Sequence, residues 1–394
     1  MQGQMNAGRR ILFFCPGASA MIGNRPWLMQ AVLIVKCGRW LTEPGSVPFL
    51  GGQMDRPIDR RNNFDLLRLL AAASVIFSHA FLLGSGREDN EPLMWLTGGQ
   101  TILGVAGVFV FFVISGFLVT TSFEETASAP RFLLKRALRI YPGFIVCLLL
   151  SALVLGPLVT TLPVGDYFRQ PDTWRYVVWN LLMDADQNSL PGVWFSGFAA
   201  GNVVDGPLWT LPCEILMYLL VLAMGMARLL RLPAIALLIV AGMVCVWFDT
   251  TSIDGVLPSA GWLLPFFASG MALYRLKDSG IFRADLALLA AFGLVASAAF
   301  HLFILLFPIF GGYLVIYLAL EKRLPLVPAA RWGDLSYGLY IYGWPVEQMV
   351  VRLSGGQAQW GKLFAISLPV AAACAFLSWH LVEKRALALK PRRR

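Results

Sequence analysis

The sequence predicts an all-α fold, namely a polytopic integral membrane protein with about ten transmembrane helices. Of the 394 residues, 57% are apolar and only 14% are charged, a composition outside the usual range of soluble domains. Several uninterrupted apolar runs approach roughly twenty residues, the length needed to cross a hydrocarbon core of about 30 Å. A third observation, the unequal distribution of basic residues between alternate loops, agrees with this fold class.

Hydropathy and the turn residues between apolar runs predict the position of each helix. In order, the expected spans are 64–84, 101–122, 138–160, 208–228, 233–250, 260–276, 284–300, 302–320, 335–352 and 363–381. The longest segment outside them, 161–207, is acidic and rich in glycine and proline. It contains one apolar piece, WRYVVWNLLM, which is too short to span and suits the membrane interface.

The positions of lysine and arginine predict the orientation of these spans. With the N-terminus placed in the cytoplasm, 21 of the 32 basic residues fall in cytoplasmic segments and five on the opposite side. The positive-inside rule therefore favours cytoplasmic N- and C-termini. The net charge of +9 belongs to the inner loops and the tail, so it indicates contact with anionic membrane lipids and no nucleic-acid partner.

The first 53 residues differ from the rest of the chain. They have mixed polarity, scattered glycine and proline, and one apolar piece shorter than a span. Met54 directly precedes DRPIDRRNNFDLLR, so we expect 1–53 to be an extension, either poorly ordered or the result of a mispredicted start, and 54–394 to be a single transmembrane domain. The six cysteines show no CxxC or Cys/His spacing, which predicts packing and no metal site.

Polar residues in the first expected span indicate where chemistry takes place. At about 100° per residue, Asp65, Arg68 and His79 fall within a stripe of roughly 60° on one helix face. Apolar residues lie between them on the same face: Ala72, Val75 and Ile76. We expect this stripe to form a groove about 16 Å long.

An arginine at membrane depth is costly and usually faces a protein interior or a wet cavity, and Asp65 is the expected ion partner of Arg68. The simpler alternative is that Asp65 and Arg68 form an interfacial ion pair and that His79 hydrogen-bonds a neighbouring helix. Three polar groups on one stripe favour a site over this alternative.

This first span and five later motifs resemble the bacterial acyltransferase family 3, membrane enzymes that transfer acyl groups, commonly acetyl, to carbohydrates. The motifs occur in the family's order: FDLLRLLAAASVIFSHAF, GVFVFFVISGFLVTTS, KRALRIYPG, GPLWTLPCEILMY, LSYGLYIYGWPVEQ and SWHLVEKRAL. Together they cover about 64–390. The resemblance implies a membrane-bound O-acyltransferase of the bacterial inner membrane, active in polysaccharide biosynthesis.

The resemblance also implies roles for particular residues. Lys135, Arg136 and Arg139, in the RxxR element, would bind the cytosolic acyl-CoA donor, because arginine clusters suit phosphate groups. Without the resemblance, the same cluster would indicate only a stop-transfer signal. Glu214 would take a structural or acceptor-orienting part near the catalytic cavity, with packing against an arginine or histidine of another span as the alternative. Two positions depart from the family pattern, namely Cys213 and Gly343, the latter standing where a histidine is common.

We expect the reaction to transfer an acyl group from acyl-CoA to a hydroxyl of a carbohydrate or lipid-linked glycan. The expected acyl group is acetyl. An acyl thioester is already activated, so the missing element is a base for the hydroxyl, and histidine suits that step. His79 would either deprotonate the acceptor directly or carry the acyl group as an acyl-imidazole. The rival function is a transporter or flippase, in which Arg68 and His79 line a solute path; the sequence shows none of the internal repeats common in such proteins.

Overall fold

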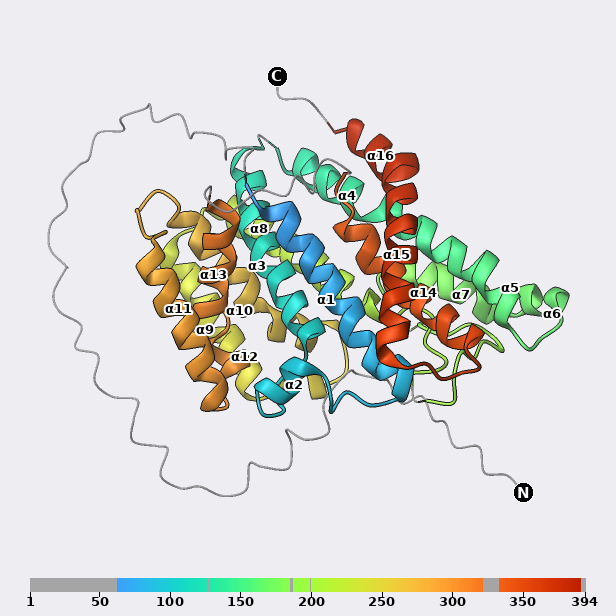
Figure 1. Ribbon diagram of the computed structural model, residues 1–394. Coiled ribbons are helices and arrows are strands. Elements are labelled where there is room, and N and C mark those ends of the chain that lie inside the picture. The colour runs from blue at the N-terminus through green and yellow to red at the C-terminus, as the bar shows by residue number, and fades with distance from the viewer. Residues whose placement is uncertain (1–61, 127, 185–186, 199, 322–332, 391–394) are drawn as a thin grey trace, which may run out of the picture.

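The computed structural model describes residues 62–390 except 127, 185–186, 199 and 322–332, and all regular structure in this part of the chain is helical (Figure 1). The longer helices are α1 (Phe64–Ser85), α3 (Leu103–Glu124), α4 (Ala129–Leu150), α8 (Thr210–Met226), α9 (Leu232–Trp247), α10 (Val256–Arg275), α11 (Ala284–Ala299), α13 (Phe310–Leu320), α14 (Ser336–Leu353) and α15 (Trp360–Ser378). The shorter ones are α2 (Pro92–Leu96), η1 (Ser151–Leu155), α5 (Gly156–Val159), α6 (Val164–Arg169), α7 (Pro171–Leu181), η2 (Gly206–Trp209), η3 (Thr250–Ser252), α12 (Phe303–Leu306), η5 (Trp379–Glu383) and α16 (Lys384–Ala388). The expected extension, 1–53, lies outside the described residues.

A helix stands at each of the ten expected positions, but the number of ten spans is not confirmed. Within the described residues, six helical stretches are long and apolar enough to cross a membrane: Phe64–Ser85, Leu103–Glu124, Ala129–Val159, Gly206–Met226, Val256–Arg275 and Trp360–Ala388. The helices α9, α11 and α13 are shorter, with 16, 16 and 11 residues. The helix α14 has 18 residues but buries Glu347 and Gln348, which lower its apolar character.

The helix α1 lies among α3, α14 and α15, and its close approach to α3 depends on small residues (Figure 1). A Cβ atom at Gly107 would lie 2.6 Å from the Ser74 hydroxyl oxygen and 2.8 Å from the Ala71 carbonyl oxygen. Small residues at such crossings let helix backbones approach, which is how membrane helices gain packing energy. The backbone of α3 is therefore held directly against the helix that carries His79.

A second close crossing joins α3 to α10. A Cβ atom at Gly116 would lie 1.9 Å from the Phe267 carbonyl oxygen, and one at Gly270 would lie 2.0 Å from the Val113 carbonyl oxygen. These distances are shorter than any real contact, so both positions need glycine. The α1–α3–α10 layer is consequently fixed by backbone contacts on both faces of α3.

The apolar piece WRYVVWNLLM forms most of α7, a short amphipathic helix packed on α4. Its apolar outer face carries Trp174, Val178 and Trp179, which are 48%, 53% and 45% exposed, whereas Tyr176 is 0% exposed on the inner face. Large exposed apolar side chains on a helix too short to span are typical of the membrane interface.

Candidate active site

His79 lies near the end of α1 in a site shared with α14. Its Nδ1 atom is 3.4 Å from Oε2 of Glu347, and its ring meets the Trp344 ring edge-on, with centroids 4.7 Å apart. The side chain of His79 is 13% exposed and that of Glu347 is 0% exposed. An imidazole and a carboxyl group from two different helices therefore face each other in a space almost closed to solvent.

The helix α14 places Trp344, Glu347 and Gln348 on one side, because residues three and four positions apart share a helix face. The Trp344 indole nitrogen donates to the Val203 carbonyl at 2.9 Å, and the Gln348 amide donates to the Ala200 and Val203 carbonyls at 2.7 and 2.9 Å. These bonds fix the chain at 200–203 across α14, next to His79.

A carboxyl group beside Nδ1 of a histidine favours the tautomer that carries its proton there, which leaves the lone pair on Nε2. The same carboxyl group stabilises the imidazolium formed when Nε2 takes a proton. The separation of 3.4 Å is longer than a good hydrogen bond, and catalytic contacts of this kind often tighten only when substrate binds. The His79–Glu347 pair thus has the composition of a general base and its orienting group.

A cluster of arginines lies at the opposite end of α1, where Asp334 bridges two helices. Oδ2 of Asp334 is 3.1 Å from Nη1 of Arg68 and 2.5 Å from Nη2 of Arg139, and Ser336 donates to Oδ1 at 2.6 Å. Burial alone would raise the pKa of Asp334, but Arg139 and Arg68 outweigh it and hold that pKa below the ordinary value. The expectation that Asp65 is the ion partner of Arg68 is therefore wrong: Asp334, 266 residues away in the sequence, takes that place.

The other two basic residues of the RxxR element lie beside α3 and α8. Lys135 donates to the Thr126 hydroxyl at 2.8 Å, and Arg136 donates to the Ser122 hydroxyl at 3.2 Å. The guanidinium of Arg136 also lies over the Tyr218 ring, 5.7 Å from its centroid, while its Nε has no hydrogen-bond partner among the described residues. An arginine with a spare donor in a basic cluster is suited to an anionic ligand.

Lys390, just beyond α16, joins the same basic region, and α16 packs against α4. Burial, together with the positive charges of Arg136, Arg139 and Lys135, lowers the pKa of Lys390 to about 8. Neighbouring cations lower the pKa of a lysine because they repel its positive charge. The lowered pKa therefore indicates that positive charge is concentrated here, and a bound anion would reduce the repulsion.

Glu214, the remaining predicted site residue, lies away from His79. It accepts a short hydrogen bond from Tyr218 of its own helix and another from Ser115 of α3 at 3.4 Å. Since Arg136 lies over the Tyr218 ring, Glu214 is connected to the basic cluster. The direct pairing with an arginine or histidine of another span, which the sequence left open, does not occur among the described residues.

The face of α1 between Arg68 and His79 is packed, so the expected open groove is not seen there. Ala72, Val75 and Ile76 are 0%, 3% and 1% exposed. Ile76 lies against Gly343, where a Cβ atom would come within 2.8 Å of it. Gly343 therefore provides the space that Ile76 fills, and a histidine at this position would collide with α1.

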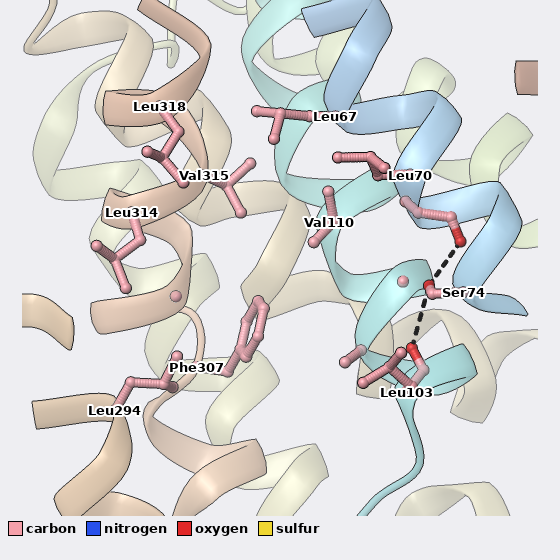
Figure 2. Close-up of a pocket in the computed structure, with 14 residues that line it drawn as sticks. Leu67, Leu70, Ser74, Leu103, Val110, Leu294, Phe307, Leu314, Val315 and Leu318 are labelled. Carbon is pink, nitrogen blue, oxygen red and sulfur yellow. Dashed lines mark hydrogen bonds between the residues drawn. The ribbon is translucent and has the colours of Figure 1, made fainter. Parts of the chain in front are cut away.

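An apolar pocket does lie along α1, but on a different side of the helix. It has a volume of about 320 Å³ and is bounded by α1, α3, α11 and α13 (Figure 2). Leu67, Leu70 and Ser74 line it from α1, and the Ser74 hydroxyl already donates to the Ala71 carbonyl at 2.8 Å. These positions are turned roughly 100–160° from Arg68. The pocket is thus separate from the stripe that carries Arg68 and His79.

Of the functional residues, the sequence missed Asp334 and the pairing of Glu347 with His79. A usable signal did exist for both: Asp334 directly precedes an expected span beside Ser336, and Glu347 is an acidic residue inside the same span. Polar groups of this kind within or next to a membrane helix indicate partners elsewhere.

Comparison with known proteins gives one family match and several curated relatives. The acyltransferase domain family matches residues 61–381. An O-acetyl transferase of Shigella phage Sf6 is 28% identical over 83% of this chain and 96% of its own length. Nodulation protein 10 of Rhizobium leguminosarum bv. viciae is 31% identical over 86% of this chain and 97% of its own, and the acyltransferase MdmB of Streptomyces mycarofaciens is 27% identical over 75% and 84%. No solved structure matches the chain.

Proposed function

Because the chain belongs to the acyltransferase domain family and is a membrane acyltransferase for groups other than aminoacyl groups, we propose that it transfers an acetyl group from acetyl-CoA to a hydroxyl of a cell-surface carbohydrate. The observation that carries this proposal is the buried His79–Glu347 pair. The printed name of the phage relative, an O-acetyl transferase, supports acetyl as the group and oxygen as its acceptor. Family membership favours this function over a transporter or flippase.

The donor binds at the cytoplasmic end of α1. The phosphates of acyl-CoA contact Arg136 and Lys135, each of which donates to a hydroxyl group, while Arg68 and Arg139 are held together by Asp334. Arg68 and His79 are about 16 Å apart along the helix, a length that the pantetheine arm can cover. Since the direct face of α1 is packed, the arm passes beside it, and the helices around α1 adjust when the donor binds.

The chemical step occurs at His79. In the direct route, Nε2 takes the proton of the acceptor hydroxyl as its oxygen attacks the thioester carbonyl, and the C–S bond breaks. Glu347 stabilises the resulting imidazolium, which returns the proton to the departing thiolate of CoA. In the two-step route, Nε2 itself attacks the thioester, and CoA leaves as the thiolate. The hydroxyl then takes the acyl group from the imidazole and gives its proton to that thiolate.

The first experiment compares membranes containing the wild type with membranes containing His79→Ala, each supplied with radiolabelled acetyl-CoA. We expect label in the cell's own glycans only with the wild type, because neither route proceeds without the imidazole. Equal transfer by both proteins would exclude His79 from the reaction. No transfer by either would exclude acetyl-CoA as the donor.

A further inference from the structure

Three polar side chains meet in the core near Trp344, where no step of the proposed reaction uses them. They are Cys147 of α4, Tyr176 of α7 and Asp205, which precedes η2, and they are 1%, 0% and 1% exposed. The Cys147 sulfur lies 3.5 Å from Oδ2 of Asp205 and 3.4 Å from the Ile341 carbonyl oxygen, so its one proton can be donated to either. Tyr176 interacts electrostatically with both Asp205 and Cys147, which places the three in one cluster.

This cluster leaves hydrogen-bonding capacity unused. Oδ1 of Asp205 and the hydroxyl of Tyr176 have no hydrogen-bond partner of normal geometry among the described residues, although the Ser151 hydroxyl lies nearby. A buried polar atom without a partner lowers stability, and nearly all such atoms in proteins are paired. Two of them side by side therefore indicate that something other than the described chain satisfies them.

The cluster adjoins the proposed catalytic histidine through a single ring. Gly206, the residue after Asp205, lies so close to the Trp344 indole that a Cβ atom there would be 3.0 Å from it. Trp344 also contacts His79, at 4.7 Å between ring centroids. A molecule bound at Asp205 and Tyr176 would thus lie one side chain away from the reacting centre.

The chemistry of the cluster identifies the class of ligand. In the part of the chain that the structure describes, no cationic side chain pairs with Asp205. The cluster therefore offers no positive charge that would bind an anionic ligand. Burial raises the pKa of Asp205 well above its ordinary value, which favours the neutral acid. A neutral carboxyl, a phenol and a thiol can each donate and accept, and a hydroxyl group offers the same two capacities.

We propose that Asp205 and Tyr176 bind hydroxyl groups of the carbohydrate acceptor and so hold it beside His79. This inference rests on the proposed function, because it supplies the second substrate of that reaction with a site. Since the side chains of the cluster are at most 1% exposed, the acceptor reaches them when the chain at 200–205 moves away from α14.

Tyr176→Phe tests this site with little risk to the fold, because it removes a hydroxyl that makes no hydrogen bond of normal geometry in the described part of the chain. The matched control is Tyr167→Phe. Tyr167 is also 0% exposed, but its hydroxyl proton is already used in a hydrogen bond to the Ala152 carbonyl at 2.7 Å, so no ligand is needed to satisfy that donor.

The full chain in lipid nanodiscs would be assayed with labelled acetyl-CoA and increasing amounts of the glycan fraction extracted from the source cells. We expect Tyr176→Phe to raise the glycan concentration for half-maximal transfer roughly tenfold, the effect of losing about one hydrogen bond to a ligand. The half-saturating acetyl-CoA concentration should stay unchanged, and Tyr167→Phe should change neither value.

An active Tyr176→Phe enzyme with unchanged glycan dependence would overturn this inference, leaving the proposed function intact and the cluster as a site for buried water. An equal rise in the half-saturating concentrations of glycan and acetyl-CoA would also overturn it, because such a rise would indicate a general structural role for Tyr176. If the wild type transfers no label, the proposed function fails and this inference fails with it.

Discussion

The pairing of His79 with Glu347 makes a prediction that depends on one carboxyl group. Glu347→Gln keeps the shape of the side chain but removes the carboxyl group that stabilises the imidazolium, so we expect kcat for transfer to fall by about a hundredfold while the half-saturating acetyl-CoA concentration is unchanged. Steady-state kinetics in nanodiscs would measure both.

Glu347→Asp provides the control for that substitution, because it keeps a carboxyl group and shifts its position. It should retain more activity than Glu347→Gln. Equal rates for the glutamine variant and the wild type would remove Glu347 from the mechanism, whatever the contact distance.

The lowered pKa of Lys390 predicts how donor binding depends on pH. Its pKa is lowered to about 8, so it is charged below this pH and neutral above it. If its charge helps to hold the phosphates of the donor, the half-saturating acetyl-CoA concentration should rise as the pH increases from 7 to 9. In Lys390→Arg, whose side chain stays charged throughout, this rise should be absent. The same rise in both proteins would assign the pH dependence to another group.

At the scale of helices, the crossing of α3 and α10 predicts a large difference between two glycine substitutions. Gly116→Ala adds a Cβ atom 1.9 Å from the Phe267 carbonyl oxygen, so the helices must separate. We expect a loss of about 1–3 kcal/mol of stability, as for other overpacked positions. Gly165→Ala in α6, where a Cβ atom meets nothing within 4 Å, is the control and should leave stability nearly unchanged. Thermal unfolding in detergent would compare them, and equal midpoints would contradict the tight crossing.

The helices also determine which predicted residues act together. The sequence placed Asp65, Arg68 and His79 on one face of the first span, and the helix α1 does carry them. That face, however, packs against α3 and α14, with Arg68 paired to Asp334 just before α14 and His79 facing Glu347 of α14. The stripe was a correct indication of interior polar contacts and a wrong prediction of an open groove.

At the scale of the whole molecule, the distribution of basic residues predicts that 161–207 faces away from the cytoplasm and that the loop after α10 faces the cytoplasm. Single cysteines at the exposed positions Asp166 and Asp278, in a background without the native cysteines, would test this orientation. In intact cells, a membrane-impermeant maleimide should label Asp166→Cys and should label Asp278→Cys only after permeabilisation. The opposite pattern would reverse the topology and move the donor site to the outer face.

By itself, the sequence determined that this protein is a helical membrane protein of an acyltransferase type, and roughly where its long helices lie, although the third begins at Ala129 and not at 138. These properties follow from hydropathy and from motifs that are local in the chain. Only the tertiary structure decided that Asp334 pairs with Arg68 across 266 residues, that Glu347 faces His79, and that Asp205 and Tyr176 share one cluster. The reason is physical: membrane helices assemble by close packing and interhelical polar contacts, and the partners of a buried polar group depend on which helices become neighbours.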